Sequence, residues 1–277
     1  MATRKTSPKR RTRRPALTAA TADKHALYER SVQDPEAEID FIDRVFRAAR
    51  GRAPVSLCED FCGTALLAAT WVKRSPERTA IGIDIDKSVL AWGTEHNLAP
   101  IGEPGRRVQL FRRDVREPMP GRGVDVLVAL NFSYWIFQTR AEMRGYFERA
   151  RRALGRDGVF VLDAYGGWES QEPMLEERAV RGGFTYVWDQ DSFDPITHRA
   201  VNHIHFRFKD GTKLERAFTY EWRFWTLPEI RELLEEAGFG DVRVYWDTSP
   251  DDKHELYRVR RRAENQPGWL AYIVAVR

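Results

Sequence analysis

Short apolar runs alternate with helical segments between residues 54 and 163, and this alternation constrains the fold more than any other feature of the sequence. Five such runs occur, at 54–58, 79–83, 108–111, 124–130 and 159–162. Amphipathic segments, as in 88–97 and 141–154, lie between several of them. This pattern is typical of βαβ units, whose parallel strands are covered by helices on both faces. Because the crossovers of such units are right-handed, the pattern predicts a doubly wound α/β fold.

The alternation of apolar runs and helical segments ends after Gly167. Three strand candidates follow with no helical segment between them, at 184–188, 200–208 and 213–224. The Asp210-Gly211 pair between the last two is typical of a hairpin turn. A helix is then predicted over 227–237, and the last two apolar runs are 242–246 and 269–276. We therefore expect a mostly parallel seven-stranded sheet with an antiparallel β insertion after its fifth strand.

Basic side chains are concentrated at the N-terminus. Residues 1–20 contain seven lysines and arginines and no acidic residue, so the rest of the chain has a net charge of −3 (+4 minus 7). Pro8, Pro15 and the scarcity of large apolar side chains predict that residues 1–21 form a disordered tail. Two interpretations of this tail remain open: a solvated extension without a specific partner, or a weak contact with nucleic acid or another anionic surface.

The composition excludes several classes of protein. No apolar run approaches the ~20 residues that a membrane span needs, and no signal-peptide core is visible. The two cysteines, Cys58 and Cys62, have the spacing of neither a zinc framework nor a disulfide scaffold, and small buried side chains are expected there. We therefore expect a cytoplasmic protein without a metal site and without a membrane partner.

Polar side chains close all five predicted strands, and they are Glu59, Asp84, Asp114, Asn131 and Asp163. Ligands of open α/β sheets bind outside the carboxyl ends of the strands. Four acids and an amide suit a ligand with several hydroxyls and amines, whereas phosphates favour backbone N–H groups and basic side chains. Each aspartate could instead serve only as a helix cap, and Asp163 stays open between these roles.

The turn after the first strand, Glu59-Asp-Phe-Cys-Gly-Thr-Ala65, sharpens this prediction. Gly63 and the small residues Thr64 and Ala65 let the backbone approach a ligand closely at a helix N-terminus. The turn is neither the G-x-G-x-x-G of a nicotinamide dehydrogenase nor a P-loop. With acids both before it and at the end of the next strand, it indicates a binding site for a small organic ligand.

From about Tyr28 to the C-terminus, the chain resembles the class I S-adenosylmethionine-dependent methyltransferases. In that family the first strand runs into Glu-x-Gly-x-Gly-x-Gly, which cradles the methionine part of the cofactor. Here Gly63 matches the second glycine, whereas Phe61 and Ala65 replace the first and the third.

The resemblance extends to the ribose and adenine side of the cofactor. Asp84 matches the acid that takes both ribose hydroxyls, with Ile85 against the adenine, and Asp114 matches the residue that reads the adenine amine. The segment that begins at Asn131 matches the one beside the transferred methyl group. The resemblance therefore implies that S-adenosylmethionine is bound by Glu59, Cys62, Gly63, Thr64, Asp84, Ile85, Asp114, Val115, Asn131 and Phe132.

The antiparallel insertion and Glu236-Ala-Gly-Phe239 resemble small-molecule N-methyltransferases that modify glycine and sugar amines. The resemblance implies in-line methyl transfer to a small-molecule amine or hydroxyl, with the insertion forming much of the acceptor pocket. The expected segments are the basic tail (1–21), an N-terminal helical lid (22–50), the cofactor-binding α/β domain (51–167), the substrate-side insertion (168–224) and the return to the α/β domain (225–277).

Three residues are candidates for a catalytic role: Tyr28, Tyr134 and His205. Tyr28 could close over the cofactor or be an ordinary core or surface tyrosine. Tyr134 belongs to an aromatic cluster that could face the sulfonium or lie in the core. His205 shares a strand face with His203, and this pair could face a substrate as a base or lie on a partly exposed surface. An amine acceptor needs only to arrive neutral, so a base is not obligatory.

Two alternatives remain open. The acceptor could be a protein or an RNA guided by the basic tail, or the chain could bind S-adenosylmethionine without catalysis. An RNA amine methylase typically carries Asn/Asp-Pro-Pro and an aromatic residue after the fourth strand, whereas this chain has Asn131-Phe-Ser-Tyr134. The sequence leaves the oligomeric state open.

Overall fold

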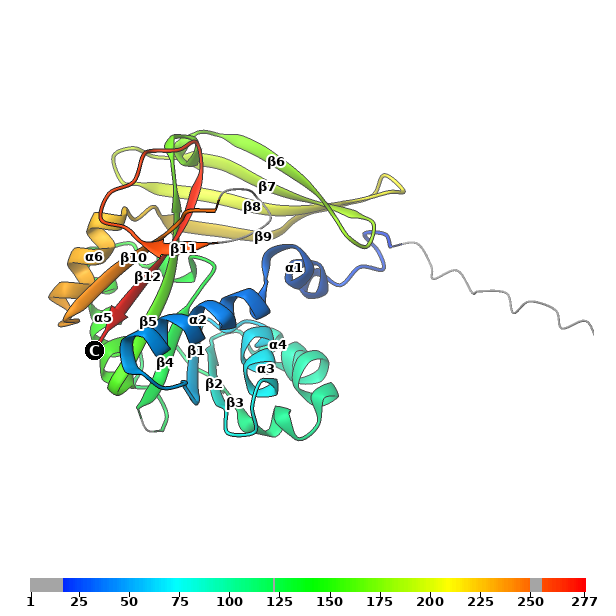
Figure 1. Cartoon of the computed structure of the whole chain (residues 1–277). Coiled ribbons are helices and arrows are strands. Elements are labelled where there is room, and N and C mark those ends of the chain that lie inside the picture. The colour runs from blue at the N-terminus through cyan, green and yellow to red at the C-terminus, as the bar shows by residue number, and fades with distance from the viewer. Residues whose placement is uncertain (1–16, 122, 250–255) are drawn as a thin grey trace, which may run out of the picture.

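The computed structural model describes residues 17–121, 123–249 and 256–277, so most of the predicted basic tail lies outside the described residues. Its central sheet has the strand order β11-β10-β12-β5-β4-β1-β2-β3 (Figure 1). The strands are β1 (Ser56–Asp60), β2 (Thr79–Asp84), β3 (Val108–Arg112), β4 (Val124–Ala129), β5 (Leu154–Gly166), β10 (Asp241–Asp247), β11 (Tyr257–Val259) and β12 (Trp269–Val276). The first five are parallel, and the last three pair antiparallel with their neighbours.

The doubly wound α/β fold is confirmed, but the expected number of strands was wrong. The sheet has eight strands rather than seven. The additional strand, β11, spans three residues and exists through its antiparallel pairing with β10. A segment of three residues is too short to show a period of two, so local sequence gives no signal for it.

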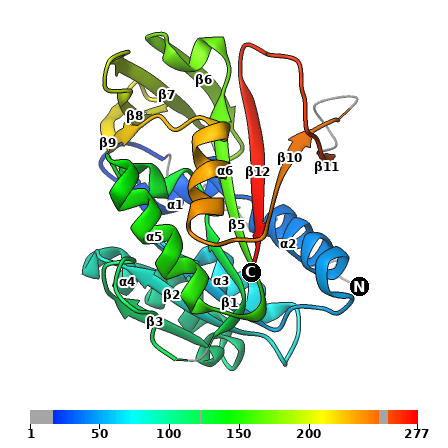
Figure 2. The same ribbon diagram turned by 90° about the vertical axis from the view of Figure 1, so that its left-hand side faces the viewer.

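Helices cover both faces of this sheet (Figure 2). The helices α2 (Pro35–Arg50) and α3 (Leu66–Lys73) share one apolar cluster with the strands, whereas α5 (Arg140–Ala153) and α6 (Leu227–Glu236) share the other. Near the β2–β3 side, α4 (Lys87–Gly93) continues into a π-helical turn (Thr94–Leu98). Short 3-10 turns occur at Ala99–Ile101, Pro104–Arg107, Ser133–Ile136 and Trp168–Gln171.

The predicted helical stretch 22–50 comprises two helices that pack on different partners. The first, α1 (Lys24–Val32), ends before Asp34, whose side chain caps α2, and Pro35 occupies the first turn of α2. Leu27 of α1 packs in a third apolar cluster with residues of the insertion. Only α1 therefore lies against the insertion, whereas α2 covers the central sheet.

The insertion is an antiparallel sheet of four strands across the end of the central sheet (Figure 1). Its strands are β6 (Met174–Val180), β7 (Phe184–Phe193), β8 (Arg199–Phe208) and β9 (Lys213–Arg223). Three of them coincide with the predicted ones, and β6 was not predicted. The middle of β6, Glu-Glu-Arg, interrupts the apolar alternation that marks a half-buried strand.

Candidate functional site

The loop from β1 into α3 has an unusual backbone. Phe61, Gly63 and Ala65 all adopt positive φ, at 57°, 51° and 55°. For Phe61 and Ala65 this left-handed conformation costs about 1–2 kcal/mol each, which is typical of a functional turn. The N–H of Gly63 donates to Oδ2 of Asp84 at 2.9 Å and thereby ties the loop to the end of β2. The N-cap residue of α3, Ala65, has no side chain that could accept the N–H groups of the first helical turn.

Glu59, near the end of β1, and Thr64, in the loop, are both buried. Glu59 is 7% exposed, and its Oε2 accepts a hydrogen bond of 3.1 Å from the N–H of Ala68. Burial raises the pKa of Glu59 well above its usual range. The Oγ1 atom of Thr64 is buried and has no hydrogen-bond partner among the described residues. An unpaired hydroxyl beside a strained loop is a place where a polar ligand atom would complete the hydrogen bonding.

A cavity of about 230 Å³ lies beside this loop, and we call it the Asp84 cavity. Its lining includes Phe61, Asp84, Ile85, Asp114 and Val115. The Ile85 side chain is 67% exposed, which provides an apolar face next to the carboxylate of Asp84. Burial raises the pKa of Asp84, although its oxygens accept the N–H groups of Gly63 and Asp86.

Asp114 is paired with a neighbouring arginine. The Nη2 atom of Arg116 lies 2.5 Å from Oδ2 of Asp114, and its Nε donates to the same carboxylate. The hydrogen bond from Arg116 lowers the pKa of Asp114. The backbone N–H of Arg116 also donates to Oδ1 of Asp114, so three donors leave about one of the four acceptor positions of this carboxylate for a ligand N–H.

The segment after β4 forms a second strained turn. Asn131 and Phe132 both have φ of 55°, and both donate their N–H groups to the carboxylate of Asp163, at 2.6 and 2.9 Å. Burial raises the pKa of Asp163 to about 7. The sequence left Asp163 open between a cap and a ligand-binding role, and the structure shows that it anchors this turn.

Asn131 and Phe132 also line a cavity of about 280 Å³, which we call the aromatic cavity. Aromatic side chains from α1, β5 and the insertion dominate its lining, which consists of Tyr28, Val32, Asn131, Phe132, Tyr165, Glu176, Arg178, Tyr186, Trp188, Ile204, Tyr220 and Trp222. The segment that contributes Asn131 and Phe132 here contributes Ile136 and Phe137 to the Asp84 cavity. The segment from Asn131 to Phe137 therefore borders both cavities.

Of the three catalytic candidates, only Tyr28 lines a cavity of this site. Its ring lies 5.0 Å from that of Phe218, and its hydroxyl shares a hydrogen bond with the hydroxyl of Tyr220. Burial raises the pKa of Tyr28, so its hydroxyl stays protonated at neutral pH. A protonated hydroxyl can donate a hydrogen bond, but it does not act as a base.

Tyr134 and His205 lie elsewhere. Tyr134 is fully buried, and its hydroxyl donates to the backbone carbonyl of Asp163 at 2.7 Å. His205 follows Ile204, which lines the aromatic cavity, so His205 points to the opposite face of the insertion sheet. There its Nε2 lies 3.1 Å from Asp189, a carboxylate partner that the sequence did not reveal.

Cys62 is buried against Gly82, and burial raises the pKa of its thiol well above the usual range. The thiol is therefore protonated and inert, so this residue contributes to the loop through its packing and backbone.

Within the described ranges, no group of three or more histidine, cysteine, aspartate or glutamate side chains could hold a metal ion. None of the helices in the described part of the chain is long and apolar enough to cross a membrane.

The sequence reasoning missed most of the aromatic cavity. The sequence did not predict four of its aromatic residues or its two charged residues, which are Tyr165, Trp188, Tyr220, Trp222, Glu176 and Arg178. One signal was available, because Phe218, Tyr220, Trp222 and Phe224 alternate along a predicted strand and so share one face.

The central sheet, its helical layers and the insertion together form the fold of the class I S-adenosylmethionine-dependent methyltransferases. An S-adenosylmethionine-dependent methyltransferase from Clostridium acetobutylicum is similar, with a TM-score of 0.67, 15% identity, and coverage of 91% of this chain and 96% of that one. CalS10, an amino pentose methyltransferase from Micromonospora echinaspora, has a TM-score of 0.66, 18% identity, and coverage of 91% and 95%.

A third similar structure is the sugar N-methyltransferase KedS8 from Streptoalloteichus sp., with a TM-score of 0.64, 19% identity, and coverage of 100% of this chain and 98% of that one. These likenesses establish the fold. No protein-family model matches the sequence, and no curated protein matches it.

Proposed function

We propose that the chain binds S-adenosylmethionine in the Asp84 cavity and transfers its methyl group to a small-molecule amine or hydroxyl in the aromatic cavity. The observation that carries this proposal is the turn at Asn131 and Phe132, whose segment borders both cavities. A methyl group passed from one cavity to the other would cross at this turn.

The residues around the Asp84 cavity fit this cofactor. The carboxylate of Asp84 would accept both ribose hydroxyls, Ile85 would cover one adenine face, and Asp114 with Val115 would read the adenine edge. Glu59 would hold the ammonium of the methionine part, because a cation beside this buried carboxyl favours its charged form. The backbone of Cys62 and Gly63 and the free Thr64 hydroxyl would hold the carboxylate part.

The bound cofactor supplies an activated methyl group, so the protein must orient the acceptor and exclude water. The walls of the aromatic cavity do both, and positioning alone contributes up to about 7–11 kcal/mol to catalysis. The aromatic faces also attract cationic groups by roughly 0.5–2 kcal/mol. The hydroxyls of Tyr28 and Tyr220 and the charges of Glu176 and Arg178 provide the polar contacts of this cavity.

A small-molecule amine is the acceptor that these features favour. The aromatic cavity, at about 280 Å³, is close in size to the pockets that hold metabolites. Side chains from α1 and the insertion form part of its wall. Two of the similar structures are described as an amino pentose methyltransferase and a sugar N-methyltransferase, which supports an amine. If the acceptor is instead an RNA or a protein guided by the tail, a variant that lacks residues 1–21 will lose activity. We expect unchanged turnover of the small-molecule acceptor.

Titration calorimetry with S-adenosylmethionine tests the proposal. The wild type should bind, and Asp84→Ala should lower the affinity by at least about 100-fold, because two hydrogen bonds to a charged group contribute about 1.5–3 kcal/mol each. Asp86→Ala, two residues away, removes an exposed carboxylate that caps α4 and serves as the control. Comparable titration of Asp84→Ala and the wild type would contradict the site. Release of S-adenosylhomocysteine across a panel of amine and hydroxyl metabolites then identifies the acceptor.

A further inference from the structure

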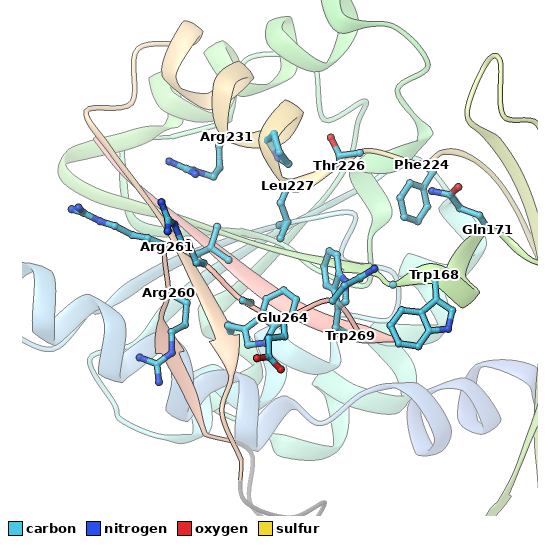
Figure 3. Close-up of a pocket in the computed structure, with 17 residues that line it drawn as sticks. Trp168, Gln171, Phe224, Thr226, Leu227, Arg231, Arg260, Arg261, Glu264 and Trp269 are labelled. Atoms are coloured by element: carbon cyan, nitrogen blue, oxygen red, sulfur yellow. The ribbon is translucent and has the colours of Figure 1, made fainter. Parts of the chain in front are cut away.

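A larger cavity of about 620 Å³, drawn in Figure 3, shares no lining residue with either cavity of the proposed site. Its lining comes from the start of α6, the segment between β11 and β12, and the segment after β5. We call it the arginine cavity, after Arg231, Arg260, Arg261 and Arg262.

The arginine cavity carries an excess of positive charge. Four arginines and one carboxylate, Glu264, line it, which gives the lining a net charge of +3. None of the four guanidinium groups has an ion pair or side-chain hydrogen bond with another described residue. Arginines nearby behave differently, since Arg223 pairs with Glu229, and Arg243 pairs with Asp241. Guanidinium groups without carboxylate partners around one hollow are the usual means of holding a phosphate or a carboxylate.

Aromatic rings form the opposite end of the cavity. Figure 3 shows Trp168 on the segment after β5, away from the arginines of α6 and of the segment after β11. Trp168 is 53% exposed, which is unusual for so large an apolar side chain. The ring of Trp269 is seated against the backbone of β5, because a Cβ on Gly166 would lie 2.2 Å from it. Trp246 lies 5.0 Å from Trp269, ring to ring.

We propose that the arginine cavity binds a small organic dianion of the phosphate-monoester class that carries a flat ring. The +3 lining matches a dianion better than a singly charged carboxylate, and the exposed Trp168 offers a face for ring stacking. The volume lies within the range of about 300–1,000 Å³ that is typical of small-molecule pockets. The arginines lie together at one end of a single hollow, whereas a nucleic-acid backbone would need positive charges along an extended groove. The proposal does not depend on the methyltransferase activity.

Calorimetry with phenyl phosphate tests this proposal on the full-length protein. Inorganic phosphate and benzyl alcohol serve as the charge-only and ring-only probes. The double variant Arg231→Ala/Arg261→Ala should weaken phenyl phosphate binding by at least about tenfold. Its matched control, Arg106→Ala/Arg156→Ala, removes two exposed arginines outside the cavity and should leave the affinity unchanged. Trp168→Ala should weaken phenyl phosphate but not inorganic phosphate.

The probes also define the results that would overturn the proposal. Absence of phenyl phosphate binding by the wild type would do so, and so would an equal loss in the control variant, since that would mean a response to net charge alone. Benzyl alcohol binding as tightly as phenyl phosphate would exclude the anion site. A single-stranded RNA that binds more tightly than phenyl phosphate, and that depends on Arg231 and Arg261, would replace the small dianion by a nucleic acid.

Discussion

The carboxylate of Asp163 accepts a hydrogen bond of 2.6 Å from the backbone N–H of Asn131. Its other oxygen accepts the N–H of Phe132, so one side chain of β5 holds two consecutive left-handed residues after β4. Because the carboxylate is buried, these hydrogen bonds only partly offset the loss of water. The turn at Asn131 and Phe132, which lines the aromatic cavity, is therefore maintained by a group that titrates near neutral pH.

The stability of the protein should depend on the ionisation of Asp163. Burial raises its pKa from 3.8 to about 7, so the folded state binds the proton more tightly than the unfolded state. The stabilising contribution is therefore complete at acidic pH and is lost as the pH rises toward 7, by about 1.4 kcal/mol per unit between pH 5 and 7. Urea unfolding at pH 5, 6 and 7 should show this decline in the wild type and a flatter profile in Asp163→Asn.

Asp157→Asn is the control for this measurement, because Asp157 is exposed at the start of β5. Its unfolding free energy should follow the wild type at each pH. Parallel profiles for Asp163→Asn and the wild type would show that Asp163 is already ionised at pH 5 in the folded protein.

Removal of the Tyr134 hydroxyl should lower the stability of the protein, whereas removal of the Tyr28 hydroxyl should lower its activity. Tyr134→Phe leaves the carbonyl of Asp163 without its buried donor, and we expect a loss of about 1–3 kcal/mol in unfolding free energy with normal cofactor affinity. Tyr28→Phe removes a hydroxyl from the aromatic cavity, and we expect about a tenfold lower kcat/KM for the acceptor with little change in stability. Urea unfolding and initial rates distinguish the two. A stable but inactive Tyr134→Phe would reverse the assignment.

The central sheet could be predicted because its signals are local. The strands β1, β2 and β4 and the helix α5 lie within a few residues of their expected bounds, since each carries its own period. The strand β5 is longer than expected because it continues beyond β4 and pairs with β12 as far as Gly166. Its extension carries Tyr165 into the aromatic cavity. The length of such a strand depends on its pairing with strands that are distant in sequence, and the local hydrophobic pattern does not reveal that pairing.

The Asp84 cavity and the aromatic cavity also differ in how far the local sequence predicts their residues. Asp84, Ile85, Asp114 and Val115 come together because parallel strands place their carboxyl ends at one edge, so strand ends alone predict this group. The aromatic cavity requires α1 and the insertion to pack over that edge, and this packing joins Tyr28 to Tyr220, which lies 192 positions later. The local sequence predicted these strands but not the partners that face each other across the cavity.

A glycine in α4 lets this helix pack closely against the loop from β1 into α3. A Cβ at Gly93 would lie 2.2 Å from the carbonyl oxygen of Thr64, so Gly93→Ala must push the loop and the helix apart. We expect a loss of about 1–3 kcal/mol in stability and weaker binding of S-adenosylmethionine. Gly145→Ala in α5 is the matched control, because nothing lies within 4 Å of its Cβ. It should raise stability by about 0.5–1 kcal/mol, and an equal loss in both variants would contradict the argument.

A buried ion pair supports the same loop from the other side. The Nη1 atom of Arg149 lies 2.7 Å from Oδ2 of Asp60, and both side chains are almost fully buried. Arg149→Met leaves the Asp60 carboxylate without its countercharge, and we expect a loss of about 3–5 kcal/mol in unfolding free energy. Because Asp60 directly follows Glu59 and precedes the strained Phe61, cofactor affinity should fall as well.

The double variant Asp60→Asn/Arg149→Met should recover part of the stability lost in Arg149→Met, because no unpaired charge then remains buried. Arg144→Met is the control, since Arg144 forms an exposed pair with Glu148 on the same helix and should contribute no more than about 0.5 kcal/mol. Urea unfolding and calorimetry of the three variants measure both effects. If Arg149→Met costs no more than Arg144→Met, solvent reaches Asp60, and the pair does not hold the start of the loop in place.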